Sequence, residues 1–119
     1  EKVRIQQAAT DIAGISMNLK AYQVDNRYFP PTLDTLPMYN PVPLDPWGRP
    51  YQYLAIDIDP PPSKGALRKD KHMNPLNSDF DLYSMGPDGK TKLPLMNPDS
   101  HDDIVRANNG AFIGVAKNH

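Results

Sequence analysis

Apolar and polar residues alternate with a helical period over the first 25 positions of the chain. Apolar side chains recur at spacings of three and four, which places them on one side of a helix, and polar side chains fill most other positions. The helix must end before Pro30, because proline forces the residue before it into extended geometry. We therefore expect one long helix over residues 1–25, with an apolar stripe of Ile5, Ala8, Ile12, Ile15, Leu19 and Tyr22.

Two segments further along alternate with the period of a β-strand. Residues 51–56 carry aromatic side chains at alternate positions, and residues 80–85 place Phe80 and Leu82 on one side and Asp81 on the other. The second segment runs into Gly-Pro-Asp-Gly at residues 86–89, which is typical of a tight turn. Two apolar segments, 104–105 and 111–116, flank a predicted turn at residues 108–110.

Proline marks the segments that connect these elements. All 14 prolines lie after residue 29, so loops must make up a large share of the chain. Residues 59–77 form a long excursion between two strands that we expect to be antiparallel. We predict a single domain over residues 1–119, made of the helix 1–25, a proline-rich loop 26–50 and a sheet and loop region 51–119. The predicted fold class is α+β, with the long N-terminal helix packed on a small antiparallel sheet of about three strands.

Composition excludes several classes of function. A net charge of −1 argues against nucleic acid as a partner, because phosphate binding needs a basic surface. The absence of cysteine excludes disulfides, zinc–thiolate sites and thiol nucleophiles. No run of about 18 apolar residues is present. The chain does not begin with methionine, and we expect that a segment has been removed before Glu1.

The chemistry that the residues suggest lies at the end of the second predicted strand. The backbone carbonyls of a strand end and the carboxylates of Asp88, Asp102 and Asp103 offer oxygen ligands to a hard cation such as calcium. The alternative is that Asp88 only shapes a type I turn and that Asp102 and Asp103 cap a helical turn. Asp79 and Asp81 are interpreted as the solvent side of their strand, and the basic cluster of Arg68, Lys69 and Lys71 as a solvated loop. No pattern supports catalysis.

Several motifs together resemble the major pseudopilins of type II secretion systems, within the type IV pilin-like superfamily. The resemblance covers about residues 1–90, and the Asp-Pro-Trp-Gly-Arg-Pro-Tyr element is its most specific part. The residues that carry it are the long N-terminal helix, Tyr22, Asp25-Asn26, Tyr28, Pro30, Thr32-Leu33, Leu36, residues 45–53 and residues 80–89.

The resemblance implies a structural subunit rather than an enzyme. Family members are made with a cleaved leader and an apolar half-helix that anchors them in the inner membrane, with the rest of the subunit in the periplasm. They polymerise with copies of themselves, with minor pseudopilins and the inner-membrane assembly platform as further partners. The filament pushes cargo through an outer-membrane channel. An aliphatic stripe buried between neighbouring subunits would suit such a polymer, and the candidates are Val3, Ile5, Ala8, Ile12 and Ile15.

The resemblance also implies a bound calcium ion (Ca2+). Carried over by position, the ligands are the Met85 carbonyl, Asp88, and the pair Asp102 and Asp103. The segment before that pair is longer than is usual in the family, which makes Asp99 a competing ligand.

Two alternative functions stay open from the sequence. One is a pilin of a related type IV-like filament used for adhesion, electron transfer or DNA uptake. The other is a free periplasmic calcium-binding module that forms no polymer.

Overall fold

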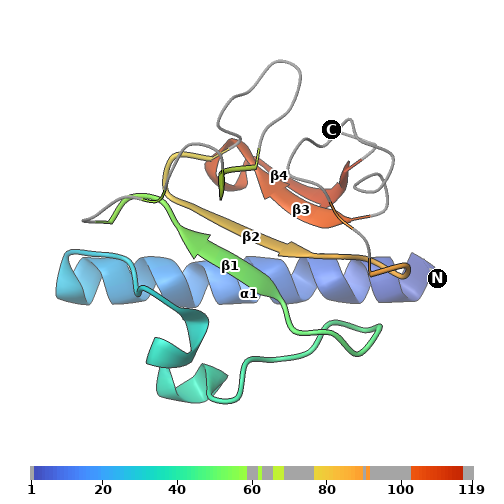
Figure 1. Cartoon of the computed structure of the whole chain (residues 1–119), viewed down its shortest axis with the longest axis horizontal. Helices are drawn as coiled ribbons and strands as arrows, with labels where there is room; N and C mark the ends of the chain where they lie inside the picture. Colours follow the sequence, from blue (N-terminus) through green and yellow to red (C-terminus); the bar gives the residue numbers. More distant parts are fainter. Residues whose placement is uncertain are drawn as a thin grey trace.

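A long helix packed on an antiparallel sheet forms the fold (Figure 1). The computed structural model describes residues 2–58, 62, 66–68, 77–89, 91 and 103–116. Among these, the helix is α1 (Lys2–Asn26), and the strands are β1 (Gln52–Ala55), β2 (Phe80–Ser84), β3 (Ile104–Ala107) and β4 (Phe112–Val115). The strands follow one another across the sheet in chain order. The α+β prediction is confirmed, and the described part of the sheet has four strands where about three were expected.

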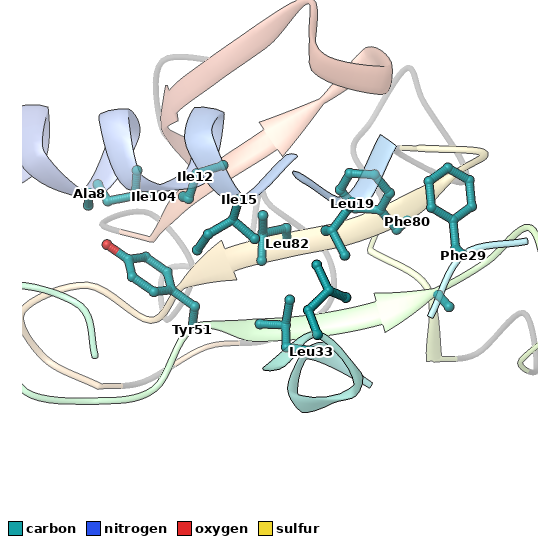
Figure 2. Packing of buried hydrophobic residues seen from close by; sticks show 12 residues of the cluster. Ala8, Ile12, Ile15, Leu19, Phe29, Leu33, Tyr51, Phe80, Leu82 and Ile104 are labelled. Atoms are coloured by element: carbon teal, nitrogen blue, oxygen red, sulfur yellow. The ribbon is translucent and has the colours of Figure 1, made fainter. Parts of the chain in front are cut away.

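One side of α1 supplies four of the twelve buried residues that the structure describes in the main hydrophobic core. Ala8, Ile12, Ile15 and Leu19 are buried, as their spacing predicts, and they pack against the sheet. Figure 2 shows this interface, in which the side chains of the helix meet those of the strands and of the loop after the helix. Each fully buried aliphatic side chain there contributes about 1.5–3 kcal/mol relative to its exposed state. The partners of the helix residues in this core include Phe29, Leu33, Tyr51, Phe80, Leu82 and Ile104.

The outer side of α1 carries a second set of apolar side chains. Val3, Met17 and Val24 are 78%, 73% and 74% exposed. Their spacing in multiples of seven residues places them on the side of the helix opposite to the buried stripe. The predicted contact stripe between subunits is therefore wrong in its main part, because Ile12 and Ile15 pack inside their own subunit. No helix among the described residues has the length and apolar character that a membrane crossing demands.

The sheet places the predicted strands in one register. β1 and β2 are antiparallel, with Tyr53 opposite Leu82, so residues 59–77 do connect two antiparallel strands as expected. β2 pairs with β3, and β3 pairs with β4, both antiparallel. The turn between β3 and β4 uses Asn109 and Gly110, which have φ of 55° and 100°. Asparagine and glycine adopt these left-handed values most readily.

The segment from the end of α1 to β1 wraps around the helix–sheet core. It contains the 3-10 turns η1 (Leu33–Thr35) and η2 (Pro37–Tyr39). The side chains of Leu33 and Leu36, both in this segment, are buried. Two hydrogen bonds of 2.7 Å attach this segment to α1: the Tyr51 hydroxyl donates to Asp11 Oδ2, and Asn18 Nδ2 donates to the Tyr39 hydroxyl. A third, also of 2.7 Å, attaches it to β1, where the Tyr53 hydroxyl donates to the carbonyl of Pro30. The proline-rich loop is thus an ordered part of the core.

Candidate functional site

The turn after β2, residues 86–89, carries Asp88, the first carboxylate of the predicted calcium site. Gly86 and Gly89 have φ of 72° and 68°, and the Gly89 amide donates a hydrogen bond of 3.4 Å to the Gly86 carbonyl. Asp88 is exposed, and Met85, whose carbonyl is the other predicted ligand in this part of the chain, is partly buried. Met85 and Asp88 lie three positions apart in the sequence, just after the end of β2.

Arg49 covers this turn from the side of the Asp-Pro-Trp-Gly-Arg segment. Its Nη1 donates a hydrogen bond of 3.4 Å to the Gly86 carbonyl. A Cβ atom on Gly89 would lie 2.5 Å from Arg49 Cζ, which is closer than real Cβ contacts come. A side chain at position 89 would therefore displace the guanidinium that covers the turn.

Asp45 fixes the same segment to the end of β2. The residue is buried, and its Oδ1 accepts hydrogen bonds from the backbone amides of Trp47 (3.0 Å) and Arg49 (2.9 Å). Its Oδ2 accepts a hydrogen bond of 2.7 Å from the Ser84 hydroxyl, which in turn accepts one from the Gly86 amide at 3.1 Å. Two segments far apart in the sequence are thereby held together just before the turn that carries Asp88.

The second part of the predicted site centres on Asp103, the residue before β3. Asp103 is completely buried, and its Oδ2 accepts hydrogen bonds from Arg68 Nη2 (3.1 Å) and from the Thr91 hydroxyl. Arg68 Nη1 also donates to Thr91 Oγ1 at 2.9 Å. Arg68 lies within the excursion 59–77 and is 1% exposed. The prediction of a solvated loop is wrong for Arg68, because a carboxylate and a hydroxyl replace water around its guanidinium.

Asp81 anchors the backbone of that excursion to β2. Its Oδ2 accepts a hydrogen bond of 2.9 Å from the Arg68 amide, and its Oδ1 accepts one of 3.0 Å from Asn77 Nδ2. Burial raises the pKa of Asp81, against the opposing effect of these two hydrogen bonds. The prediction that Asp81 lies on a solvent side of the strand is wrong, because the excursion covers that side.

A second buried arginine, Arg106 in β3, holds the start of β2. Its Nη1 and Nη2 donate to Asp79 Oδ1 and Oδ2 at 2.7 and 2.6 Å, and Nη1 also donates to the Phe80 carbonyl at 3.1 Å. Burial alone would raise the pKa of Asp79, but the hydrogen bonds from Arg106 and Phe80 and the charge of Arg106 outweigh it and lower that pKa. Asp79 is therefore a structural partner of Arg106 rather than a free surface carboxylate.

Comparison with known proteins gives one consistent group of relatives. A protein of Pseudomonas aeruginosa named type II secretion system core protein G is 34% identical over 109 residues, covering 76% of this chain and 64% of that protein. Proteins of the same name from Vibrio cholerae and Pectobacterium carotovorum are 31% and 30% identical, covering 76% and 87% of this chain and 62% and 63% of their own lengths. The chain belongs to the major pseudopilin family of type II secretion systems.

The pseudopilin spans less than two thirds of the length of these relatives, at 64%, 62% and 63%. No protein-family model matches it, and no solved structure does. Its family consists of structural subunits rather than enzymes, which confirms the prediction that the chain is not an enzyme.

The predicted calcium ligands are only partly placed in this pseudopilin. Asp99 and Asp102 lie outside the described residues. Among those that are described, no group of three or more acidic or histidine side chains is arranged to hold a metal ion. Met85 and Asp88 offer oxygen atoms of the kind that calcium prefers. One carboxylate oxygen of Asp103, Oδ2, already accepts hydrogen bonds from Arg68 and Thr91, so a metal ion at this residue would share the carboxylate with a guanidinium.

Sequence reasoning missed three residues that shape this part of the pseudopilin: Asp45, Arg68 and Arg106. The sequence did contain a signal for the role of Asp45, because Asp followed by Pro-Trp-Gly is typical of a turn in which the carboxylate accepts hydrogen bonds from backbone amides. Arg68 and Arg106 gave no such signal. Their partners Asp103 and Asp79 are 35 and 27 residues away in the chain, beyond the reach of any local pattern.

Proposed function

We propose that this pseudopilin polymerises through α1 into a pseudopilus that drives protein export across the outer membrane. The observation that carries the proposal is the exposed apolar side of the helix, formed by Val3, Met17 and Val24. The three side chains lie 14 and 7 residues apart along one side of α1, where a neighbouring helix packed lengthwise would cover all of them. Burial against a neighbouring subunit would stabilise the contact by about 1.5–3 kcal/mol per side chain. The names of the relatives support the secretion system as its setting.

The proposal includes an anchor and a set of partners. The relatives are longer than the segment that matches this chain. We propose that the full-length protein carries an apolar N-terminal segment that anchors it in the inner membrane, with the described domain in the periplasm. Its partners would be further copies of itself, the minor pseudopilins and the inner-membrane assembly platform. Nucleic acid is not among them, in keeping with a net charge of −1.

The test places a charge on the exposed side of α1 in the full-length protein. Met17→Glu and Val24→Glu are expected to abolish filament formation and to leave secreted substrates in the periplasm, because each buries a carboxylate in the proposed contact. The folded domain should keep its melting temperature, since both side chains are exposed in the subunit. Electron microscopy of filaments and a secretion assay provide the two measurements.

Met38→Glu is the matched control, since Met38 is 64% exposed and lies on η2 instead of the helix. Normal filaments and normal secretion by this variant, together with loss by the helix variants, would support polymerisation through α1. Normal assembly by Met17→Glu and Val24→Glu would contradict it. A filament that forms but supports no secretion would favour a related pilus over a secretion pseudopilus.

We also propose, on the resemblance alone, that calcium binds beside the turn 86–89. Met85 and Asp88 would supply a carbonyl and a carboxylate oxygen, and Asp99 and Asp102 are the remaining predicted ligands. A bound ion would restrain the turn by giving its oxygen atoms a common partner. The hydrogen bonds of Asp45, Ser84 and Arg49 hold the strand end beside this turn in place.

A further inference from the structure

Two contacts with β2 hold Arg68 in place, in addition to the hydrogen bonds that its guanidinium makes. Its backbone amide donates to Asp81 Oδ2 at 2.9 Å, and its guanidinium stacks over the ring of Tyr83 at 4.2 Å from the ring centroid. Asp81 and Tyr83 are both residues of β2. A planar guanidinium favours this kind of aromatic contact. The strand therefore fixes both ends of the arginine, and the direction of its charged group is set.

The charged group joins two places that are far apart along the loop between β2 and β3. Nη1 donates to Thr91 Oγ1 at 2.9 Å, and Nη2 donates to Asp103 Oδ2 at 3.1 Å. The Thr91 hydroxyl also donates to Asp103 Oδ2. Thr91 and Asp103 are the described residues on either side of positions 92–102. One cation thus contacts both of the described residues that flank positions 92–102.

Asp103 is fixed at the other side of the contact by the sheet. Its backbone carbonyl accepts a hydrogen bond of 2.8 Å from the Ala116 amide, next to β4. The residue is completely buried, and so is nearly all of Arg68. Inside a protein, removing one partner of such a pair leaves an uncompensated charge without water. Neither side chain is therefore available to change partners without a large loss of stability.

A calcium ion that bound Asp103 Oδ2 would compete with this arginine. Calcium binds carboxylate oxygen atoms at about 2.3–2.6 Å, which would bring two positive charges close to the guanidinium. Arginine stays charged at every pH that the protein can meet, so it cannot relieve the repulsion by losing a proton.

We propose that the guanidinium of Arg68 is a built-in cation that closes the loop between β2 and β3, and that it commits Asp103 to this contact in place of a metal ion. The excursion 59–77 thereby supplies the positive charge for the second half of the predicted site. This inference does not depend on polymerisation, nor on whether calcium binds at Asp88.

The test is thermal unfolding of Arg68→Gln, Asp103→Asn and the double variant, each in excess calcium and in excess chelator. Each single substitution is expected to lower the melting temperature on the order of 10 °C in chelator, and the double variant by far less than the sum. Any rise in melting temperature that calcium gives to the wild-type chain should be the same in Asp103→Asn. Arg27→Gln removes an exposed arginine and serves as the control, with no expected change.

Three results would overturn the proposal: an unchanged melting temperature in Arg68→Gln, additive losses in the double variant, or a loss in Asp103→Asn that occurs only in calcium. The failure of calcium to stabilise any of the chains would leave the expected pattern in chelator intact. It would therefore contradict calcium binding at Asp88 without touching the arginine contact.

The unmodified chain offers a second test that survives if the variants fail to fold. In nuclear magnetic resonance spectra, the guanidinium protons of Arg68 should exchange slowly with water, because the group is buried and hydrogen-bonded. Titration with calcium should leave the guanidinium signals of Arg68 in place. Fast exchange of the Arg68 guanidinium protons, or their loss on addition of calcium, would contradict the proposal.

Discussion

The apolar core between α1 and the sheet differs in kind from the two arginine clusters that surround β2. In the core, side chains such as Ile12, Leu19 and Leu82 are buried among apolar neighbours. In the clusters, Arg68 and Arg106 bury full charges beside Asp103 and Asp79. The core supplies non-directional stability in proportion to buried area, whereas the clusters depend on specific distances and protonation states.

The core and the arginine clusters stabilise different parts of this fold. The core holds the helix to the sheet and would tolerate apolar replacements of similar size. The clusters hold particular loops in place, since the guanidinium of each arginine pairs with a carboxylate at least 27 residues away in the sequence. Changes in pH and salt should therefore act on the loops around β2 before they act on the helix–sheet interface.

Ile12→Ala should produce the largest loss among the changes that sharpen this comparison. Ile12 is completely buried, and removal of its outer methyl groups should lower the free energy of unfolding by about 2–5 kcal/mol. Urea unfolding at neutral and at mildly acidic pH should give the same loss, because no charge is involved. Met17→Ala on the exposed side of the same helix is the control and should change stability by less than about 0.5 kcal/mol. A loss at Ile12 that varies with pH would contradict the distinction between core and clusters.

Acid should act on the Arg106 cluster through Asp79. Its pKa is lowered in the folded protein, so its contribution is present above the unfolded value of about 3.9 and is lost as pH falls through the folded value. Asp79→Asn should destabilise the neutral protein by on the order of 1 kcal/mol, because part of the carboxylate reaches solvent. Below about pH 4 the difference between the variant and the wild type should shrink.

The difference between variant and wild type is the quantity to follow, measured by urea unfolding across this pH range. In both the variant and the wild type, the contribution of Asp81 to stability changes with pH in the opposite direction to that of Asp79. The pKa of Asp81 is raised, so its contribution is present at low pH and is lost as pH rises through the folded value. A variant that stays equally destabilised down to the acid limit would show that Asp79 is not the titrating partner of Arg106.

Asp88→Ala should have the smallest effect, and only in calcium. The side chain is exposed, so the variant and the wild type should melt at nearly the same temperature in chelator. If calcium binds at the turn as proposed, the wild type should melt a few degrees higher in excess calcium and the variant should not, because the ion stabilises the folded state by mass action. Differential scanning calorimetry gives both values. The same calcium response in both chains would rule out Asp88 as a ligand.

The sequence predicted the helix and its buried stripe well, because the period of Ala8, Ile12, Ile15 and Leu19 is a local signal. It also predicted the turn that carries Asp88. The same alternation misled at Asp81, since a period of two separates the sides of a strand but does not say which sides are covered. The alternation predicted that the side of β2 with Asp81 faces solvent, but the excursion around Arg68 covers that side. Contacts between residues so far apart in the sequence produce no local pattern.

The backbone of the turn after β2 also limits which residues position 89 can hold. At position 89 the backbone takes φ of 68°, and the hydrogen that an L-side chain would replace points at Arg49. The positive φ disfavours most residues other than glycine and asparagine, and any Cβ atom would have to push the end of the Arg49 side chain aside. The backbone conformation is thus the main constraint at position 89. In a library of natural substitutions it should rank among the least tolerant positions of the chain, even though it lies on a turn.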